Sequence, residues 1–286
     1  MSIKAYESDT RPDWCPGCGD FGVLAAVKDA LATLNIPPHN VVISSGIGCS
    51  SNFPGFIKTY GFHGLHGRPI PVAIGMKDAN PNLTVLVTAG DGDEYGIGFN
   101  HMIHAARRND DIKVIVMNNE IYGLTTGQLS PTSRLKQVTK TSPSGSIIYP
   151  LNPLAALIGD GATFVARGFS GQPKHLSMLI QEAIKHRGFA LVDVLSPCVT
   201  WYDIYDEVRK LMYKLEDKGH NPADFYAAMK AAKDEERLPL GIFYRDETKP
   251  SFQEMLKEQI GDGRWASKSV TPLNSETLRE LEYEFS

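Results

Sequence analysis

The sequence predicts an α/β fold with a doubly wound parallel sheet, and three observations favour it. Apolar runs of strand length recur along the chain of 286 residues. Stretches with apolar residues at helical spacing separate several of these runs, and the runs end in polar or glycine-rich turns. Strands that are apolar throughout are buried on both faces, so we expect a parallel sheet with helices on both sides.

The buried strands and the helices between them can be placed from these patterns. In chain order we expect a helix at 22–34, strands at 41–44 and 83–88, a helix at 97–108, and strands at 114–117 and 190–195. Asp20 is expected to cap the first helix. Ligands of doubly wound sheets bind beyond the carboxyl ends of the strands. The distinctive glycine-rich and polar segments follow these ends, so we expect the functional site there.

The sequence changes character after about Val199. Residues 1–198 hold all the expected strands and are predicted to form one domain. Residues 199–286 are charged and aromatic, with helical stretches such as 205–215, and we expect no buried strand there. We interpret this second part as a C-terminal extension that contacts another subunit, with the last twenty or so residues loosely ordered.

The composition excludes two classes of partner. The formal net charge is -4 and the isoelectric point is about 6.1, so the chain has no broad basic field for nucleic acid. No segment reaches the roughly 20 consecutive apolar residues of a membrane span. The segment 1–20 lacks the apolar core of a secretory signal. We therefore expect a cytoplasmic protein that binds neither nucleic acid nor membrane.

Two oxygen ligands follow neighbouring strands of the predicted sheet. Asp91 lies between two glycines at the end of one strand, and Asn119 lies at the end of the next. A right-handed crossover places such strand ends side by side, where a carboxylate, an amide and a backbone carbonyl can bind a hard cation. A Gly-Asp-Gly sequence alone indicates only a simple turn. Together with Asn119 it predicts magnesium holding a diphosphate, with glycines that let backbone N–H groups approach the phosphate.

The four cysteines form one pair and two single residues. Cys15 and Cys18 are a C-x-x-C pair, Cys49 lies in the glycine-rich loop after the first strand, and Cys198 follows the last strand. Unligated buried thiols, disulfides, a redox dithiol or half of a zinc site each fit some of these positions, although a reducing cytosol disfavours disulfides. Folding could also gather all four at one tetrathiolate site.

These residues resemble a known family. The pairing of Gly90-Asp91-Gly92 with Asn118-Asn119 resembles the fingerprint of enzymes that bind thiamine diphosphate. The segment 118–128, Asn-Asn-Glu-Ile-Tyr-Gly-Leu-Thr-Thr-Gly-Gln, is more similar still to its version in pyruvate and other 2-oxoacid:ferredoxin oxidoreductases. The four cysteines also have counterparts in the beta subunit of that family. The chain therefore resembles this beta subunit from about residue 11 to residue 198.

The resemblance implies the ligands of two metal centres and a cofactor site. Asp91, Asn119 and the Ile121 carbonyl would hold Mg2+, and Cys15, Cys18, Cys49 and Cys198 would bind a 4Fe-4S cluster. The residues expected to bind thiamine diphosphate lie on loops after the strands: Ile47, Gly48, Cys49, Ser50, His66, Gly90, Asp91, Gly92, Asp93, Asn119, Ile121, Gly123, Leu124 and Thr125. The Ser50 hydroxyl could instead cap the backbone of its own turn.

The resemblance also implies a reaction and partners. The expected activity is coenzyme A-dependent oxidative decarboxylation of a 2-oxoacid, with 2-oxoglutarate favoured and pyruvate next, to acyl-CoA and CO2. Electrons would pass through the cluster to ferredoxin. Thiamine chemistry needs a carboxylate, usually Glu, on the aminopyrimidine ring, and the sequence offers no convincing one. We therefore expect an alpha subunit, or a fused gamma-alpha subunit, to supply it in a dimer of heterodimers.

Two other functions remain open from the sequence. A subunit of a nonoxidative thiamine-diphosphate-dependent 2-oxoacid decarboxylase would share the Asp91 and Asn119 features but has no use for four cysteines. A noncatalytic, zinc-stabilised binding protein would use the cysteines and leave the magnesium fingerprint without a function. Neither alternative accounts for both sets of residues.

Overall fold

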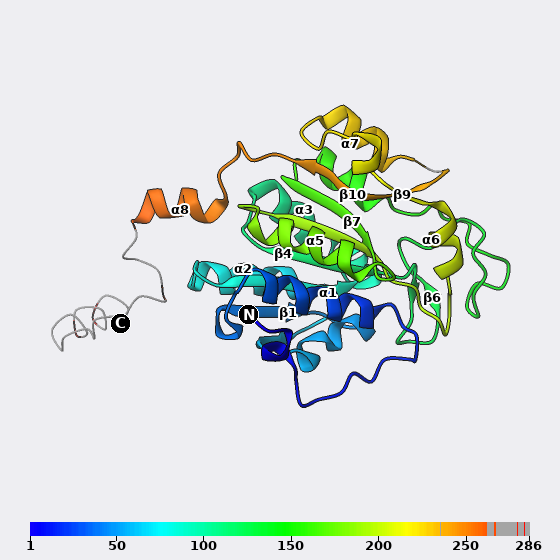
Figure 1. Cartoon of the computed structure of the whole chain (residues 1–286), viewed down its shortest axis with the longest axis horizontal. Helices are drawn as coiled ribbons and strands as arrows, with labels where there is room; N and C mark the ends of the chain where they lie inside the picture. Colours follow the sequence, from blue (N-terminus) through cyan, green and yellow to red (C-terminus); the bar gives the residue numbers. More distant parts are fainter. Residues whose placement is uncertain (235, 262–265, 267–278, 280–282, 284–286) are drawn as a thin grey trace.

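The computed structural model describes residues 1–234, 236–261, 266, 279 and 283. Its centre is a sheet of eight strands in the order β2-β1-β3-β4-β8-β7-β10-β9 (Figure 1). The strands are β1 (Val41–Ser45), β2 (Tyr60–His63), β3 (Thr84–Gly90), β4 (Lys113–Asn118), β7 (Phe164–Phe169), β8 (Ala190–Leu195), β9 (Met212–Lys214) and β10 (Leu238–Arg245). A separate hairpin joins β5 (Ile121–Tyr122) to β6 (Gln128–Leu129).

The strands β2, β1, β3, β4, β8 and β7 are parallel, whereas β10 pairs antiparallel with β7, and β9 runs parallel to β10. The four innermost of these strands, β1, β3, β4 and β8, are buried along nearly their whole length. This confirms the prediction of a mostly parallel, doubly wound sheet. The carboxyl ends of the parallel strands therefore lie along one edge.

Helices cover both faces of the sheet. One face carries α1 (Asp20–Thr33) and α5 (Pro173–Lys185), which pack against each other in front of the sheet in Figure 1. The other face carries α2 (Pro69–Ala79), α3 (Phe99–Arg108), α4 (Pro153–Gly159) and α7 (Phe225–Ala232). Two further helices, α6 (Tyr205–Leu211) and α8 (Phe252–Ile260), lie outside these layers. The helix most important for the site is α1, because it begins directly after the Cys15–Cys18 segment.

Short 3-10 and π-helical turns complete the fold. They are η1 (Ile3–Tyr6), η2 (Pro38–Asn40), η3 (Cys49–Phe56), η4 (Gly92–Ile97) and η5 (Glu216–Lys218), of which η4 is π-helical. Within the described residues, no helix combines the length and the apolar character that a bilayer crossing requires.

Two expectations about helix starts are corrected by the structure. The expected helix at 97–108 begins at Phe99, because the chain first forms the π-helical turn η4 directly after Asp91. Asp20 does not cap α1: Gly19 occupies the cap position, and Asp20 is the first helical residue. The Asp20 carboxylate instead accepts a hydrogen bond from Ser196 Oγ at 2.7 Å.

The expectation that strands end near residue 199 is wrong. Both β9 and β10 follow that point and extend the main sheet, with β10 paired to β7. Their sequence is hard to recognise because Pro239 and Gly241 interrupt the apolar run of β10. The strand β7 was also missed, because it contains Arg167, whose charge is satisfied by the buried Asp193 at 2.7 Å. The loose order expected of the last twenty or so residues falls almost entirely outside the described residues.

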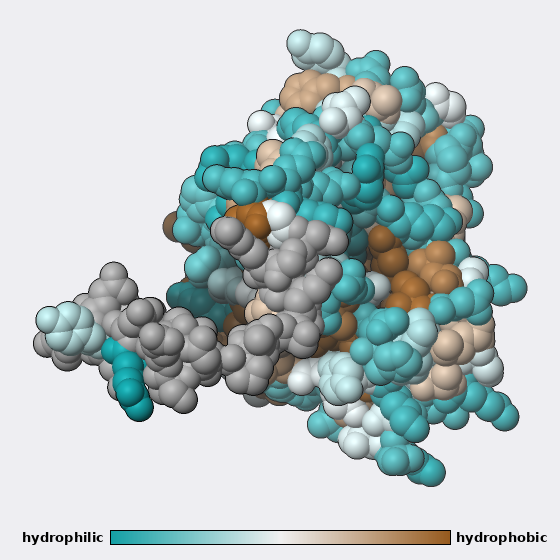
Figure 2. Space-filling view, turned by 90° about the vertical axis from the view of Figure 1, so that its left-hand side faces the viewer, coloured by the Kyte–Doolittle hydropathy of each residue, from teal (hydrophilic) through white to brown (hydrophobic). Residues whose placement is uncertain are grey.

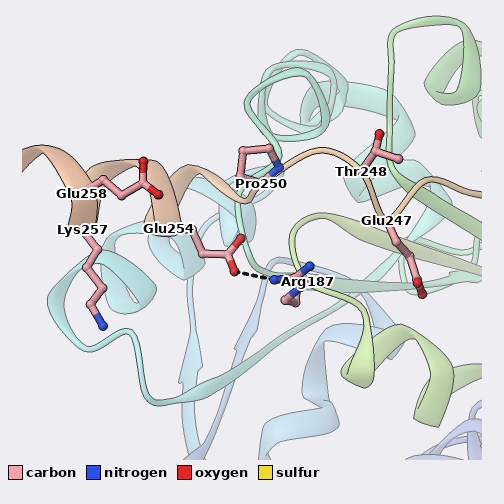
Figure 3. A pocket seen from close by; sticks show the side chains of 7 residues that line it. All are labelled: Arg187, Glu247, Thr248, Pro250, Glu254, Lys257 and Glu258. Atoms are coloured by element: carbon pink, nitrogen blue, oxygen red, sulfur yellow. Dashed lines mark hydrogen bonds and ion pairs between the residues drawn. The ribbon is translucent and has the colours of Figure 1, made fainter.

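The amino ends of the strands lie away from the predicted site. Figure 2 shows this end of the molecule, where the surface is largely hydrophilic with an apolar group beside the grey residues. A shallow cavity of about 520 Å³ lies beside α8, and in Figure 3 Arg187 points toward Glu254, with which it forms an ion pair at 3.2 Å. Because both side chains are exposed and the charges are mixed, we assign no chemistry to this cavity.

Candidate active site

The loops after β1, β2, β3 and β4 surround one cavity of about 370 Å³ at the carboxyl edge of the sheet. Every residue that the sequence predicted to bind thiamine diphosphate lines this cavity. Tyr122 lines it as well and was not predicted. The position agrees with the general rule for ligand sites in doubly wound sheets.

Asp91 is a buried carboxylate at the floor of the cavity, with an exposed fraction of 1%. Its Oδ2 accepts hydrogen bonds from Ser130 Oγ at 2.5 Å and Thr132 Oγ1 at 2.6 Å. Its Oδ1 accepts the Asn119 backbone N–H at 3.4 Å. Burial raises the pKa of Asp91 to about 6, while these donors oppose the rise. Among the described residues no ion pair neutralises Asp91, so the carboxylate suits a cation.

The loop that carries Asn119 is held in a tight reversal. Glu120 has the left-handed backbone angle φ 59°, and the chain turns there from β4 into the β5–β6 hairpin. The Glu120 carboxylate is paired with Arg134 Nε at 2.7 Å, and its carbonyl accepts the Ser133 hydroxyl at 2.6 Å. The Asn119 side-chain oxygen accepts the Ile121 N–H at 3.1 Å. These contacts hold the loop that carries both groups the resemblance assigns to magnesium, the Asn119 amide and the Ile121 carbonyl.

Asp93 joins three of the loops around the cavity. Its Oδ1 accepts the Gly67 N–H at 2.7 Å and the Ile47 N–H at 3.2 Å, and it lies 2.5 Å from His66 Nδ1. Its Oδ2 leaves no room at Gly46, where a Cβ atom would lie 1.8 Å away. Burial raises the pKa of Asp93, and the three donors oppose the rise. Asp93 therefore lines the cavity and also, as a structural hub, holds the loops of Ile47, His66 and Gly67 together.

His66 is oriented by two neighbours. Asp93 binds the Nδ1 side of the ring, which assigns the proton to Nδ1 and leaves Nε2 for a ligand in the cavity. The ring edge faces Tyr122, with 6.2 Å between ring centroids. The Tyr122 hydroxyl in turn donates to the Gly92 carbonyl at 2.9 Å. Sequence reasoning had no signal for Tyr122 beyond its place within the 118–128 segment.

The four cysteines lie in one group beside this cavity. The sulfur atoms of Cys198 and Cys49 lie 3.5 and 4.0 Å from the position that a Cβ atom would take at Gly123. Burial and then the charge of Asp20 raise the pKa of the Cys18 thiol, and the nearby Cys198 and Cys49 raise it further. Cys15 acts on the pKa of Cys49 in the same way as these neighbours. None of the four forms a disulfide.

Backbone contacts bring these thiols together from three parts of the chain. The Gly19 N–H donates to the Pro197 carbonyl at 3.2 Å, which joins the C-x-x-C segment to the neighbour of Cys198. Trp14 Nε1 donates to the Cys49 carbonyl at 2.7 Å, which joins the same segment to the cofactor loop.

The four cysteines are free thiols, exposed at Cys15 and half-buried at Cys18, Cys49 and Cys198. Among the described residues, no three His, Cys, Asp or Glu side chains converge closely enough to bind one metal ion. A zinc ion takes its thiolates at about 2.3 Å around one metal, whereas each iron of a 4Fe-4S cluster takes one thiolate. Burial, and then the charge of Asp20, raise the pKa of Cys49 to about 11. Bound iron would reverse this shift.

The cavity lacks a free carboxylate for an aminopyrimidine ring. Asp91 and Asp93 line it: hydrogen bonds occupy both oxygens of Asp91 and Oδ1 of Asp93, and the unpartnered Oδ2 of Asp93 lies against Gly46. Glu94 is buried and does not line the cavity, and burial raises its pKa well above the ordinary value. In the described part of the chain, the activating carboxylate that thiamine chemistry needs is therefore missing from the cavity.

The fold and the cavity define a thiamine-diphosphate-binding protein. Residues 46–194 match the family model described as "Thiamine pyrophosphate enzyme, C-terminal TPP binding domain". Residues 198–259 match the family model for the C-terminal region of the beta subunit of pyruvate ferredoxin oxidoreductase. The two matches together extend across both parts of the chain.

Whole-chain relatives identify the family. The chain is 45% identical over 262 residues to the 2-oxoacid:ferredoxin oxidoreductase subunit beta of Saccharolobus solfataricus, covering 86% of each chain. It is 38% identical over 262 residues to the 2-oxoglutarate synthase subunit KorB of Methanocaldococcus jannaschii, covering 91% of this chain and 97% of the relative. The chain therefore belongs to the family of 2-oxoacid:ferredoxin oxidoreductase beta subunits.

A solved structure supports the same placement. The 2-oxoglutarate:ferredoxin oxidoreductase from Magnetococcus marinus, with 2-oxoglutarate, coenzyme A and succinyl-CoA bound, matches with a TM-score of 0.88 at 39% identity. The match covers 98% of this chain and 96% of that chain. The predicted family and fold type are thus confirmed.

Proposed function

We propose that this chain is the beta subunit of an enzyme that oxidatively decarboxylates a 2-oxoacid. One 2-oxoacid and one coenzyme A would give acyl-CoA, CO2 and a proton, and the two electrons released would reduce two one-electron ferredoxins. The observation that carries the proposal is the position of Cys49. It lines the cavity and also belongs to the group of four thiols, so a one-electron acceptor would adjoin the site of carbon chemistry.

Different residues of the cavity would bind the metal, the diphosphate and the substrate. Asp91, Asn119 and the Ile121 carbonyl would hold Mg2+, and the glycines at 90 and 92 leave room for a diphosphate beside it. His66, held by Asp93, would present Nε2 to the bound molecules as a hydrogen-bonding group. When bound, thiamine diphosphate supplies the electron sink for decarboxylation, and a 4Fe-4S cluster supplies one-electron transfer.

For the substrate we propose 2-oxoglutarate first and pyruvate second. The support is the set of relatives named for 2-oxoglutarate and the neighbour that holds 2-oxoglutarate and coenzyme A. The test is ferredoxin reduction by the reconstituted complex with each oxoacid. We expect a kcat/KM for 2-oxoglutarate at least tenfold above that for pyruvate, which is about 1.4 kcal/mol. Activity should require coenzyme A. Turnover to an aldehyde without coenzyme A or ferredoxin would contradict the proposal.

For the assembly we propose an alpha or fused gamma-alpha subunit that closes the cavity, in a cytoplasmic dimer of heterodimers with ferredoxin as acceptor. Four exposed apolar side chains, named the rim, lie on the loops of the cavity: Ile47 and Leu124 line it, Leu65 precedes the lining residue His66, and Ile97 adjoins Gly67. Their exposed fractions are 41, 54, 74 and 54%. Exposed apolar groups beside an incomplete site favour a protein partner. Exposed aromatic residues at 225 and 226 support a further interface with a partner protein in the segment 199–286.

Replacing Leu65 with Asp should weaken binding of the alpha subunit. A charge at the rim has to be desolvated when the partner covers it, so we expect an affinity loss of roughly tenfold or more. The measurement is sedimentation of the mixed subunits. The matched control is Met178→Asp, an exposed apolar residue of α5 away from the cavity, which should associate normally. Normal association of the Leu65 variant would remove Leu65 from the interface.

Replacing Gly46 with Ala should weaken thiamine diphosphate binding through Asp93. The new Cβ would overlap Asp93 Oδ2 and displace the carboxylate that joins the Ile47, His66 and Gly67 loops. Changes of such supporting residues typically cost about 10 to 100-fold in affinity. The control is Gly75→Ala inside α2, where a Cβ meets nothing within 4 Å. It should raise stability by about 0.5–1 kcal/mol and leave cofactor affinity unchanged. Equal affinities for both variants, measured by calorimetry, would argue against the hub function of Asp93.

The two alternatives fit the site less well. A nonoxidative decarboxylase would leave four grouped thiols beside the cavity without a function. A zinc-stabilised binding protein would leave the cavity, with its Asp91 and Asn119, without a function. Iron and zinc analysis of the purified chain distinguishes the proposals.

A further inference from the structure

Tyr122 connects the two loops that would hold the magnesium ion. It directly follows Ile121 in the β5–β6 hairpin, and it lines the cavity. Its hydroxyl donates to the carbonyl of Gly92, the residue after Asp91, at 2.9 Å. The side chain therefore begins on the loop of Asn119 and ends on the loop of Asp91. No step of the proposed chemistry uses it.

The turn η4 leaves space for the Tyr122 side chain. A Cβ atom at Gly92 would lie 2.3 Å from Tyr122 Cε1, and one at Gly96 would lie 2.9 Å from the hydroxyl oxygen. Two glycines four residues apart in this turn thus permit the close approach of one aromatic side chain. On its other side the ring faces His66, with 6.2 Å between centroids. The ring is therefore confined between η4 and His66.

The backbone of Tyr122 is fixed as well. Its carbonyl accepts the Gly127 N–H at 2.9 Å, and the residue pairs with Gln128 across the hairpin. The Ile121 carbonyl belongs to the peptide group that ends at the Tyr122 nitrogen, and a peptide group is planar and rigid. Because Tyr122 is held at both its backbone and its hydroxyl, the direction of the Ile121 carbonyl is restricted.

We propose that Tyr122 is a positioning residue that holds the loop of Asn119 and Ile121 at a fixed distance from Asp91, and so gives the site its preference for Mg2+. The inference rests on the proposed function, because it requires a cation between these loops. Mg2+ demands oxygen ligands at about 2.0–2.1 Å in nearly ideal octahedral geometry, whereas Ca2+ accepts them at about 2.3–2.6 Å in flexible geometry. Loosening the gap between the loops should therefore cost Mg2+ more than Ca2+.

The test removes the hydroxyl and keeps the ring. Tyr122→Phe loses the hydrogen bond to Gly92 but still fills the space beside η4. The matched control is Tyr213→Phe on β9, which loses a hydrogen bond of 3.2 Å to Asp234 and does not line the cavity. Both variants are purified as the complete complex and titrated calorimetrically with Mg2+, and separately with Ca2+, in the presence of thiamine diphosphate. Thermal unfolding is recorded in parallel.

We expect the Mg2+ affinity of Tyr122→Phe to fall roughly tenfold, as for other losses of a contact that supports a metal ligand. The Ca2+ affinity should fall less, so the ratio of the two affinities decreases, which a general loss of stability would not produce. Tyr213→Phe should bind both ions as wild type does. An unchanged ratio in Tyr122→Phe, or an equal loss of Mg2+ affinity in both variants, overturns the inference.

A substitution on η4 tests the same contact from the other side. Gly96 does not line the cavity, and a Cβ atom there would press on the Tyr122 hydroxyl, which Tyr122→Phe lacks. Gly96→Ala should therefore weaken Mg2+ binding in the wild-type chain and change it less in the Tyr122→Phe background, because substitutions at contacting residues are not additive. Equal changes in both backgrounds, or no change in either, would overturn the inference.

Failure of the proposed function is distinguishable in the same titrations. A wild-type complex that binds thiamine diphosphate equally well with and without Mg2+ would contradict the proposed cation site itself. A wild-type complex that requires Mg2+, together with a Tyr122→Phe complex of identical ion preference, would contradict only the inference.

Discussion

Asp91→Asn is expected to lower the affinity for Mg2+ and thiamine diphosphate by roughly 100-fold or more, because loss of a direct ligand should exceed the 10 to 100-fold cost of changing a supporting residue. Asparagine keeps the size of the side chain, and the hydroxyls of Ser130 and Thr132 can reorient to bind it. The fold should therefore survive. What is lost is the buried negative charge that a divalent cation requires.

The measurement for Asp91→Asn is calorimetric titration with thiamine diphosphate in the presence of magnesium, combined with iron analysis. Iron content should equal that of wild type, since Asp91 is not among the four thiol ligands. An affinity within threefold of wild type would show that the diphosphate does not bind through this carboxylate.

Cys198→Ser is expected to have the opposite pattern. The variant should lose most of its cluster iron, and ferredoxin reduction should fall by roughly 100-fold or more, because one iron loses its thiolate. Thiamine diphosphate affinity should stay close to wild type, since Cys198 does not line the cavity. Anaerobic iron and sulfide analysis checks the first expectation, and the same calorimetric titration checks the second.

The two variants are controls for each other. The chain has four cysteines and all are assigned to the cluster, so no fifth cysteine is available as a neutral comparison. Full iron retention in Cys198→Ser would remove this residue from the ligand set. Loss of both cofactors in either variant would indicate general misfolding and not a specific site.

Much of the site could be predicted because its residues lie at the ends of recognisable strands. Asp91 and Asn119 each follow an apolar run, and a parallel sheet necessarily brings such ends to one edge. The four cysteines could be assigned to one group only with the help of the family resemblance. Their separations in the sequence do not indicate how far apart the sulfur atoms lie in the folded chain. The structure adds the contact between the Gly19 and Pro197 backbones that joins the two distant segments.

The supporting residues could not be predicted, because they reach the site through tertiary contacts. Ser130 and Thr132 bind Asp91 from beyond the β5–β6 hairpin, and Arg134 binds Glu120 from the same segment. Polar residues in a loop give no periodic pattern that would indicate such partners. Asp20 was expected to cap a helix, since that is the common local use of such a residue, but its carboxylate instead accepts a hydrogen bond from the distant Ser196.

The C-terminal strands show a different limit of sequence reasoning. The strand β10 is largely buried, yet Pro239 and Gly241 give its sequence the pattern of an irregular segment. Pairing with β7 on one side and β9 on the other compensates for both residues. Residues 199–245 are therefore partly integral to the sheet, and we retain only as a proposal that the segment after 198 also contacts another subunit.

The most direct test of the central claim is an anaerobic visible spectrum, with iron and sulfide analysis, of this chain purified with its alpha subunit. The account predicts a brown complex with about four irons per chain. Its colour should bleach when 2-oxoglutarate and coenzyme A are added together. A colourless complex that still binds thiamine diphosphate would contradict the account and indicate a nonoxidative decarboxylase.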